Sequence, residues 1–322
     1  MKLATVRVDN RDRLAFSPDG TQLYELGPLL KGSALDPVPA TMLDLIEAGP
    51  DYWAQLRAAL VQATPTLNRA AAIDTNRMSW QAPVMRPSKI CCLALNNSAN
   101  SDRIMKGPKH PASFIKPASS LLGHLGTIEL QPVYGRVHPE PELAVVIGKR
   151  AKHVSAAQAY DYVFGYTIHN DITSPTMRAE DTFHYRAIHP KGDGSNEIAY
   201  VDTWTSYPGR YKGSDTFACM GPWLVTRDEI PDPHALRVSC SHRGSLVTDD
   251  NTSNLFFKVP EVIEFLSNYM TLLPGDIISM GTALKKSAGG AAVQNIDLNH
   301  LGGPVSVAIE GLGNLENSVR HA

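Results

Sequence analysis

Short apolar runs separated by turn residues dominate the chain beyond about residue 86. Such runs, about four to eight residues long and rich in β-branched and aromatic side chains, are typical of strands. We expect strands at Ile90 to Leu95, Leu143 to Ile147, Val163 to Ile168, Trp223 to Thr226, Ile277 to Met280 and Val305 to Ile309. The pattern predicts an α+β fold that is mainly β.

Two helices are expected to interrupt these strands. One covers about Ala156 to Tyr162, and the other covers about Glu261 to Met270, with Pro260 at its entrance. In the second helix the apolar residues recur at the spacing of one buried helical face. That face should pack against the strands.

The residues before the strands predict a smaller module. An apolar run, a Ser-Pro-Asp-Gly turn at 17–20 and a second apolar run indicate a hairpin, because Pro fixes the turn and Gly permits a positive φ. Two short helices are expected at Met42 to Glu47 and Trp53 to Leu60. Gly49-Pro50 is interpreted as a breaker between them.

A boundary is expected where two prolines and little periodicity predict a linker, at residues 81–87. A length of 322 residues corresponds to about two domains. We therefore expect a small N-terminal α/β domain at 1–85 and a larger, mainly β domain at 86–322.

Composition and charge narrow the choice of partners. The 30 basic and 32 acidic residues are spread along the chain and give a net charge of -2, so no patch favours nucleic acid or an anionic membrane. No stretch is apolar for the length of a membrane span, and the first residues lack the apolar core of a signal peptide. The chain is therefore expected to be cytoplasmic, with reduced cysteines and a small-molecule partner.

Two carboxylates lie two residues apart at the head of one apolar run. Glu140 and Glu142 point to the same face of the expected strand, and a second run ends in Asn170-Asp171, which can bring a third ligand from a neighbouring strand end. Three carboxylates completed by water match Mg²⁺ or Mn²⁺. The alternatives are solvated carboxylates on an edge strand, where Pro141 breaks no ladder bond, and an ordinary Asn-Asp turn.

Other chemistries find weaker support in the sequence. His184 and His189 lie five residues apart without a thiolate partner, and the chain has no H-E-x-x-H motif, so an ordinary loop is a better interpretation than a zinc site. The absence of a G-x-S-x-G elbow, a P-loop and a dinucleotide fingerprint argues against a serine hydrolase or a nucleotide enzyme.

A set of motifs occurs in a fixed order along the second part of the chain. They are Glu140-x-Glu142-Leu143-Ala144-Val145-Val146-Ile147-Gly148, Gly165-Tyr166-x-x-x-Asn170-Asp171, Lys212-Gly213-Ser214-Asp215-Thr216-Phe217, Gly221-Pro222-Trp223, Leu273-Pro274-Gly275-Asp276 and Gly281-Thr282. Together they resemble the fumarylacetoacetate hydrolase superfamily from about Lys89 to Val319. The resemblance implies a mixed β-roll catalytic domain, a homodimer, and a divalent cation, Mg²⁺ before Mn²⁺ or Ca²⁺, held by Glu140, Glu142 and Asp171.

The resemblance also implies roles for single residues. Lys212 matches the family's active-site lysine beside the metal, and Gly281 and Thr282 match the loop that contacts the carboxylate or oxo oxygen of the substrate. Arg178 stands where the family's S-x-R-D-x-Q segment has its Gln, and we expect it to bind substrate. The segment Asp181 to Tyr211 is expected to form either a lid over the site or a dimer loop.

One family motif is missing. Where members carry N-Y-x-x-H-A-x-E, this chain places Asn100 at the position of the His and Arg103 at the position of the Glu. An amide and a guanidinium cannot act as a general base near neutral pH. We consider His110, His169 and His184 as replacements.

Three functions follow from these residues. The first is a metal-dependent hydrolase that cleaves a C–C bond in an acylpyruvate or related 1,3-dioxo acid, in the catabolism of aromatic or other carbon compounds. The alternative is a dehydratase, isomerase or decarboxylase that acts on a 2-oxo acid through an enolate held by the metal. The third is a non-catalytic ligand-binding protein, against which the retained Lys212 argues. In each case Lys285 and Lys286 favour a small anionic oxo acid.

Overall fold

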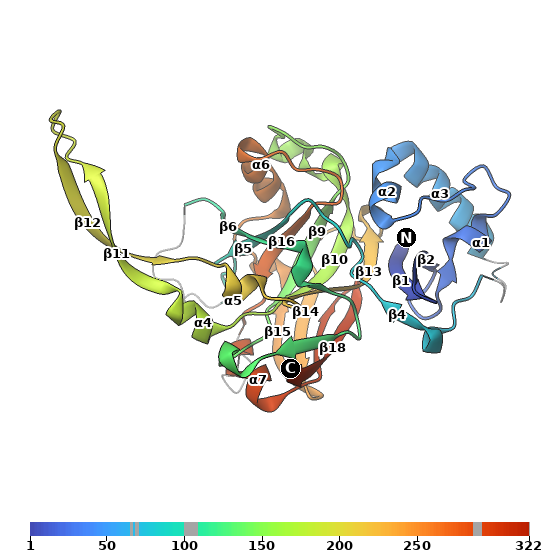
Figure 1. Ribbon diagram of the computed structural model, residues 1–322. Coiled ribbons are helices and arrows are strands. Elements are labelled where there is room, and N and C mark those ends of the chain that lie inside the picture. The colour runs from blue at the N-terminus through green and yellow to red at the C-terminus, as the bar shows by residue number, and fades with distance from the viewer. Residues whose placement is uncertain (65–66, 68–70, 100–108, 286–291, 322) are drawn as a thin grey trace.

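The computed structural model describes residues 1–64, 67, 71–99, 109–285 and 292–321. It confirms the mainly β, α+β fold class, since two mixed sheets make up most of the molecule and short helices lie around them (Figure 1). Within the described ranges, no helix is both long and apolar enough to cross a membrane.

A large sheet forms the centre of the molecule and has 11 strands among the described residues. Its path runs through β3 (Tyr24–Glu25), β2 (Arg11–Ser17), β1 (Lys2–Val8), β13 (Ala218–Thr226), β10 (Val163–Asp171), β9 (Pro141–Ile147), β16 (Ile277–Thr282), β5 (Ile90–Ala94) and β6 (Ala112–Lys116). Beside this path, β4 (Met78–Trp80) pairs with β1, and β7 (Leu121–Leu122) pairs with β13. β5 and β16 are parallel, whereas β9 and β10 are antiparallel, so the sheet is mixed.

A second, five-stranded sheet packs against the first. Its order is β15 (Ser245–Asn251), β14 (Arg237–His242), β17 (Val305–Ile309), β18 (Gly313–His321) and β8 (Thr127–Leu130). Apolar side chains of both sheets share one buried cluster, which includes Val145, Ile168, Cys240 and Val307. This shared layer is the core of the β-roll, because each sheet must bury its apolar face against another layer.

Most of the α-helices are short, and they lie around the sheets. They are α1 (Leu26–Leu30), α2 (Met42–Glu47), α3 (Gly49–Ala63), α4 (Pro175–Glu180), α5 (Arg210–Gly213), α6 (Val259–Tyr269) and α7 (Leu298–Leu301). The helix expected at 261–270 is α6, which buries Val262, Ile263 and Leu266. The helix expected at 156–162 is a 3₁₀ helix.

The N-terminal residues extend the large sheet. The predicted hairpin is formed by β2 and β3, and β1 joins it to the other strands by pairing with β13. α2 has the predicted bounds, but Gly49-Pro50 begins α3, because Pro is favoured in the first turn of a helix. Apolar side chains of this region share a second buried cluster with Val146 and Leu224 of the large sheet. The division between residues 85 and 86 stays a prediction.

A two-stranded ribbon stands apart from both sheets. β11 (Thr182–Pro190) and β12 (Ile198–Ser206) pair along their full length. Figure 1 shows this ribbon, which we call the arm, pointing away from the body on the side opposite the N-terminal residues. It lies within the segment 181–211 that the sequence assigns to a lid or a dimer loop.

Candidate active site

Three carboxylates meet at one edge of β9 and β10. Glu140 precedes β9, Glu142 is the second residue of β9, and Asp171 is the last residue of β10. One ligand oxygen from each lies within 4.8 Å of the other two. The antiparallel register brings them together: His169 lies opposite Glu142, and the Asp171 N–H donates to the Glu140 carbonyl at 2.9 Å.

The strand that carries the glutamates lies inside the large sheet. β9 is flanked by β10 and β16. The alternative interpretation of Glu140 and Glu142 as solvated carboxylates on an edge strand is therefore wrong, and Glu142 is only 1% exposed. Pro141 is tolerated because it is the first residue of the strand.

Groups on β16 hold the two glutamates. Thr282 Oγ1 lies 3.1 Å from Glu140 Oε2 and 3.0 Å from Glu142 Oε1. Ser279 Oγ and, at 3.2 Å, the Gly281 N–H donate to Glu142 Oε2. Glycine is required at 281, because its φ is +95° and a Cβ would lie 2.9 Å from a neighbouring side-chain carbon.

Two buried ammonium groups lie against the carboxylates. Lys212 Nζ donates to Glu140 Oε2 and to Asp171 Oδ2, each at 2.6 Å. Lys116 Nζ donates to Asp171 Oδ1 and, at 2.7 Å, to the Phe217 carbonyl. When all five groups of the cluster are ionised, two positive charges balance two of the three carboxylates. One negative charge then remains in largely buried surroundings.

Burial and charge act in opposite directions on these groups. Burial raises the pKa of the Asp171 carboxyl, but Lys116 and Lys212 outweigh burial and hold that pKa well below its ordinary value. Burial lowers the pKa of the Lys212 ammonium, but Asp171 and the two glutamates raise it well above its ordinary value. Asp171 is therefore ionised and Lys212 charged near neutral pH.

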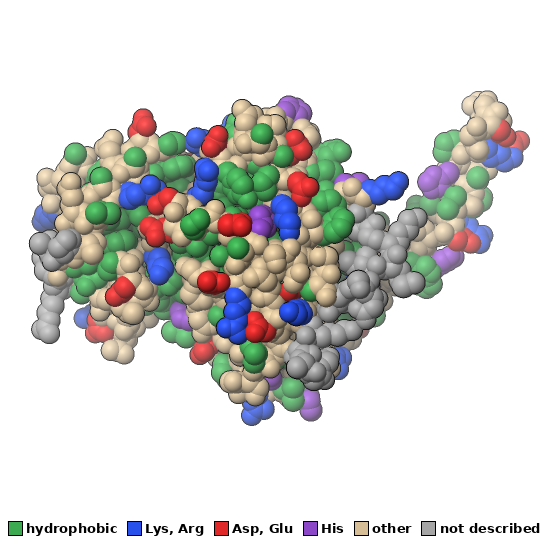
Figure 2. Space-filling view, turned by 180° about the vertical axis from the view of Figure 1, so that it is seen from behind, with side chains coloured by type: hydrophobic (Ala, Val, Ile, Leu, Met, Phe, Trp, Pro, Cys, Tyr) green, Lys and Arg blue, Asp and Glu red, His purple; other side chains and the backbone are tan. Residues whose placement is uncertain are grey.

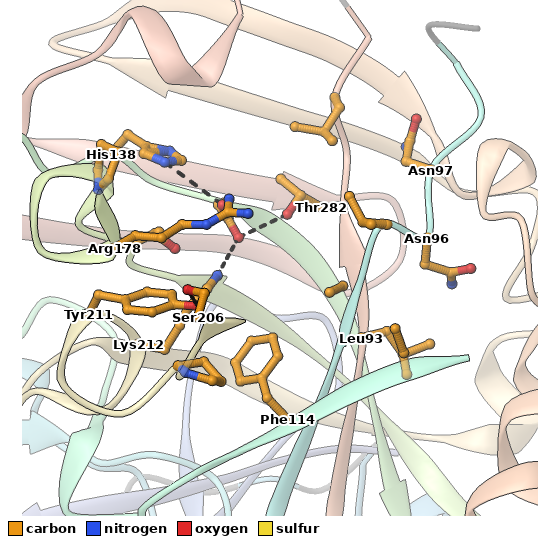
Figure 3. A pocket seen from close by; sticks show the side chains of 18 of the residues that line it. Leu93, Asn96, Asn97, Phe114, His138, Arg178, Ser206, Tyr211, Lys212 and Thr282 are labelled. Carbon is orange, nitrogen blue, oxygen red and sulfur yellow. Dashed lines mark hydrogen bonds and ion pairs between the residues drawn. The ribbon is translucent and has the colours of Figure 1, made fainter. Parts of the chain in front are cut away.

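A cavity of about 500 Å³ opens beside the carboxylates. Its wall includes Glu140, Lys212, Thr282 and His138, together with Phe114, whose ring centroid lies 5.1 Å from Lys212 Nζ. In Figure 3 the interactions drawn from His138, Thr282 and Lys212 converge on one carboxylate, which is that of Glu140. A cavity with a few convergent polar groups is typical of a site for a small molecule.

The predicted substrate-binding residues lie in two places. Thr282 and Arg178 line the cavity. The Arg178 guanidinium has no ion-pair partner within the described part of the chain, so it is available to an anion. Gly281 lies behind the wall, on a smaller pocket, and its N–H donates to Glu142. The substrate roles of all three residues stay predictions.

The three histidines considered as a base are not on the described wall of the cavity. His169 is fully buried, with Nδ1 2.7 Å from Ser279 Oγ. His110 stacks on Phe265 of α6, with 5.4 Å between the ring centroids. His184 lies on the arm. Each is therefore a poor candidate for proton transfer in the cavity.

Asn100 and Arg103, at the positions of the missing family motif, and Lys286 lie outside the described residues. Two others that belong to the site were not assigned a role: Lys116, described above, and His138. His138 Nε2 lies 3.8 Å from Glu140 Oε1. Burial lowers the pKa of His138 more than Glu140 raises it. The sequence feature that could have indicated a role for His138 is its position two residues before Glu140.

Asp250 of β15 joins two loops that form walls of the cavity. Its Oδ2 accepts hydrogen bonds from Asn97 Nδ2 at 3.1 Å, the Leu284 N–H at 2.8 Å and the Lys285 N–H at 3.1 Å. Asn97 follows β5, Leu284 follows β16, and both line the cavity. Because β5 and β16 are parallel, their carboxyl ends lie at one edge of the sheet. Asp250, which is buried, therefore fixes both walls.

The residues of the carboxylate cluster fit a hard divalent cation. All three candidate ligands are carboxylates, and the two ammonium groups leave one negative charge for a cation to balance. Oxygen ligands suit Mg²⁺, Mn²⁺ or Ca²⁺, whereas structural zinc prefers thiolate and imidazole ligands.

The chain is similar in sequence to known proteins. The family model described as fumarylacetoacetate (FAA) hydrolase C-terminal matches residues 89–320. The rat protein named oxaloacetate tautomerase Fahd2a, mitochondrial, is 33% identical over 262 residues, which cover 80% of this chain and 73% of that protein. An uncharacterized protein of Pyrococcus abyssi is 38% identical over 236 residues, which cover 73% of this chain and 91% of that protein.

Solved structures are similar over the whole chain. Maleylpyruvate hydrolase from Sphingobium sp. SYK-6, in complex with manganese(II) ion and pyruvate, aligns over 100% of both chains with 28% identity and a TM-score of 0.69. A 5-carboxymethyl-2-hydroxymuconate delta-isomerase from Mycobacterium smegmatis aligns over 100% of this chain and 99% of that one, with 25% identity and a TM-score of 0.66. The chain belongs to the fumarylacetoacetate hydrolase family.

Proposed function

We propose that this chain is a divalent-metal-dependent enzyme that moves a proton next to the 2-oxo group of a small oxo acid, as a tautomerase or isomerase. The observation that carries this choice is the pair Asn100 and Arg103, which replaces the imidazole and carboxylate expected to activate water. Proton transfer through an enolate requires stabilisation of negative charge and no water nucleophile. The names of the rat tautomerase and the Mycobacterium smegmatis isomerase support the proposal.

The carboxylate cluster is the proposed metal site. Glu140, Glu142 and Asp171 would hold the cation, with Mg²⁺ expected and Mn²⁺ or Ca²⁺ as alternatives. When bound, it supplies a Lewis acid for the oxo and carboxylate oxygens of the substrate. The manganese and pyruvate in the maleylpyruvate hydrolase structure support both the metal and the class of ligand.

The chain's own residues would orient the substrate and stabilise its negative charge. Lys212 places a fixed ammonium in buried surroundings, where electrostatic stabilisation is strongest. Arg178 is positioned to bind a second carboxylate at the cavity wall, and the Thr282 hydroxyl lies beside both glutamates. His138 is the first residue to test as a proton carrier, because its ring lies on that wall.

Enol decay and product release test the proposal. With Mg²⁺ present, we expect the protein to accelerate loss of the enol absorbance of oxaloacetate without releasing pyruvate, and chelation should abolish the effect. A panel of acylpyruvates, assayed for pyruvate release with the same preparation, gives the comparison. Higher kcat/KM for pyruvate release than for enol decay would sink the tautomerase assignment.

Hydrolysis of a C–C bond in an acylpyruvate or related 1,3-dioxo acid, in catabolism, is the second candidate. Its support is the maleylpyruvate hydrolase structure, which is similar over the full length of both chains. It requires a group that activates water in place of the residues at positions 100 and 103. Pyruvate release that depends on His138 would favour this candidate.

The assembly and compartment are also proposals. We propose a homodimer as the active form, as the family resemblance implies, and a cytoplasmic location. Several relatives are named mitochondrial, so fractionation of the source cells is the relevant test of location. Sedimentation of an active monomer at micromolar concentration would contradict the dimer.

A further inference from the structure

The arm is a ribbon without a packing partner. β11 and β12 pair with each other and, among the described strands, with nothing else. Figures 1 and 2 show it projecting from the body in two opposite views. An isolated two-stranded hairpin is marginally stable in water unless another surface covers it.

Apolar side chains occupy both faces of the arm. Its large exposed hydrophobic residues are Phe183, Tyr185, Ile188, Ile198, Tyr200, Val201 and Trp204, each between 47% and 70% exposed. Because side chains alternate along a strand, Tyr200 and Trp204 lie on one face, while Tyr185 and Val201 lie on the other. A partner must therefore contact the arm from both sides, as a groove does.

Four charged side chains of the arm and its turn form two ion pairs. Arg186 Nε donates to Asp202 Oδ1 at 2.8 Å, and the Lys191 ammonium contacts the Glu197 carboxylate. The arm therefore has no basic surface of the kind that binds nucleic acid or anionic lipid. It also has no charge-free apolar segment of the kind that enters a membrane. A protein surface is the partner that this chemistry fits.

The exposed area of the arm can be compared with the area that a symmetric interface buries. With about 200 Å² for each fully exposed aromatic side chain, the four aromatic residues of the arm leave roughly 450 Å² in water. In a dimer each of the two arms would bury this area, and each surface that receives an arm would bury an equal area. The total of roughly 1,800 Å² lies within the range of about 1,200–2,000 Å² for stable interfaces. A second copy of this chain supplies both the arm and its receiving surface, as a twofold interface requires.

We propose that the arm packs on a second copy of this chain, and that the exchange of two arms holds the dimer together. This inference rests on the proposed homodimer and specifies its contact surface. The root of the arm adjoins the active site, because Ser206 lines the cavity and its Oγ lies 3.3 Å from Tyr211 Oη. The arm therefore reaches a wall of the cavity.

Trp204 gives a direct report on burial of the arm. The chain has four tryptophans. Trp53, Trp80 and Trp223 are partly or fully buried in the body, whereas Trp204 is exposed in the single chain. The difference in fluorescence between the wild type and Trp204→Tyr isolates its emission. In the full-length protein at micromolar concentration, we expect sedimentation to show a dimer and Trp204 fluorescence to be shielded from quenching by iodide. Dilution that dissociates the dimer should restore quenching of Trp204 by iodide.

Two matched substitutions test the contact itself. Tyr200→Ser and Tyr269→Ser each remove an exposed tyrosine, the first from the arm and the second from α6. We expect Tyr200→Ser to raise the dimer dissociation constant by about tenfold or more, and Tyr269→Ser to leave it unchanged. Ile188→Ser repeats the test at a second position on the face of Tyr200.

The outcomes separate this inference from the dimer itself. A dimer in which iodide quenches Trp204 fully would overturn the arm contact and leave the proposed dimer standing. A monomer would overturn both. A monomer in which Trp204 becomes shielded only when oxalate is added would show that the arm is a lid, and would also overturn the inference.

Discussion

At the scale of single residues, the charge on Lys212 is the feature of the site that is easiest to test. Lys212→Met keeps most of the side-chain length and removes the ammonium that contacts Glu140 and Asp171. We expect kcat to fall by about 10²–10³, the loss typical of one group that stabilises a developing anion. Mn²⁺ affinity should be kept or increased, because the carboxylates lose a competing positive charge.

Steady-state kinetics and calorimetric titration with Mn²⁺ measure these two effects. Lys152→Met, at a lysine on the surface, is the control for loss of a positive charge. A loss of kcat smaller than about tenfold in Lys212→Met would show that the ammonium does not act in the rate-limiting step.

Glu142 tests the metal site separately from the lysine. Glu142→Gln keeps the shape of a buried side chain and removes its charge. We expect Mn²⁺ to bind at least about 100-fold more weakly, so that the rise in Tm produced by Mn²⁺ in the wild type is lost. Thermal unfolding with and without Mn²⁺ measures this, with Glu129→Gln on β8 as a control. Zinc retained on histidines in the purified protein would contradict the assignment.

A site residue is easier to predict when the residues that indicate its role lie close to it in the sequence. Glu140 and Glu142 are two residues apart at the start of one apolar run, so alternation alone predicts a shared face. Lys116 ends a strand whose other positions are exposed or only partly buried, and nothing near it in the sequence indicates a carboxylate. Only the fold places Asp171 against it, since the two residues lie 55 positions apart.

At the scale of elements, Asp250 links β15 to the ends of β5 and β16. Its two oxygens accept hydrogen bonds from Asn97 Nδ2, Asn254 Nδ2 and three backbone N–H groups, those of Asn251, Leu284 and Lys285. Asp250→Asn turns one of these acceptors into a donor. We expect the free energy of unfolding to fall by about 1–3 kcal/mol, because a buried donor is left without a partner.

The same substitution should raise KM more than it lowers kcat, because the two walls it releases line the cavity while the proposed metal ligands keep their contacts. Urea unfolding and steady-state kinetics measure the two effects. Asp249→Asn is the matched control, since that neighbouring side chain lies at the surface and pairs with Arg237. Equal losses of stability in both variants would contradict a special role for Asp250.

Interior strands could be predicted because both of their faces are buried. β9, β10 and β13 are buried at every position, so each contains a continuous apolar run in the sequence. β14 and β15 expose one face and carry polar side chains there. The arm exposes both faces, and its aromatic residues are mixed with charged ones. Such strands have no continuous run to identify them.

At the scale of the whole molecule, the N-terminal residues and the two sheets meet around His124. The His124 ring packs against Trp80 of β4 at 5.2 Å between centroids, and Trp80 packs against Trp223 of β13 at 5.1 Å. His124 Nδ1 accepts a hydrogen bond from the Glu316 N–H of β18 at 3.0 Å. Trp80 belongs to the predicted N-terminal domain, whereas His124, Trp223 and Glu316 belong to the predicted second domain. Nothing in the sequence indicates that these residues lie together, so their contact could not be predicted.

Burial lowers the pKa of His124 from 6.5 to about 4. The folded protein therefore binds a proton at this ring less readily than the unfolded chain does. The stabilisation is complete above the unfolded pKa of 6.5 and is lost as the pH falls toward 4. Because the ring is partly exposed, we expect a discounted loss of about 1–2 kcal/mol between about pH 7.5 and pH 5.

His124→Asn isolates this contribution from those of other buried histidines. The asparagine oxygen can take the place of Nδ1 as an acceptor for the Glu316 N–H, and it does not titrate. Urea unfolding at the two pH values should show a smaller loss of stability in the variant than in the wild type. Burial also lowers the pKa values of His138 and His234, but these two residues contribute equally to the loss in both proteins. If instead the variant and the wild type lose stability in parallel, protonation of His124 is not what loosens this junction.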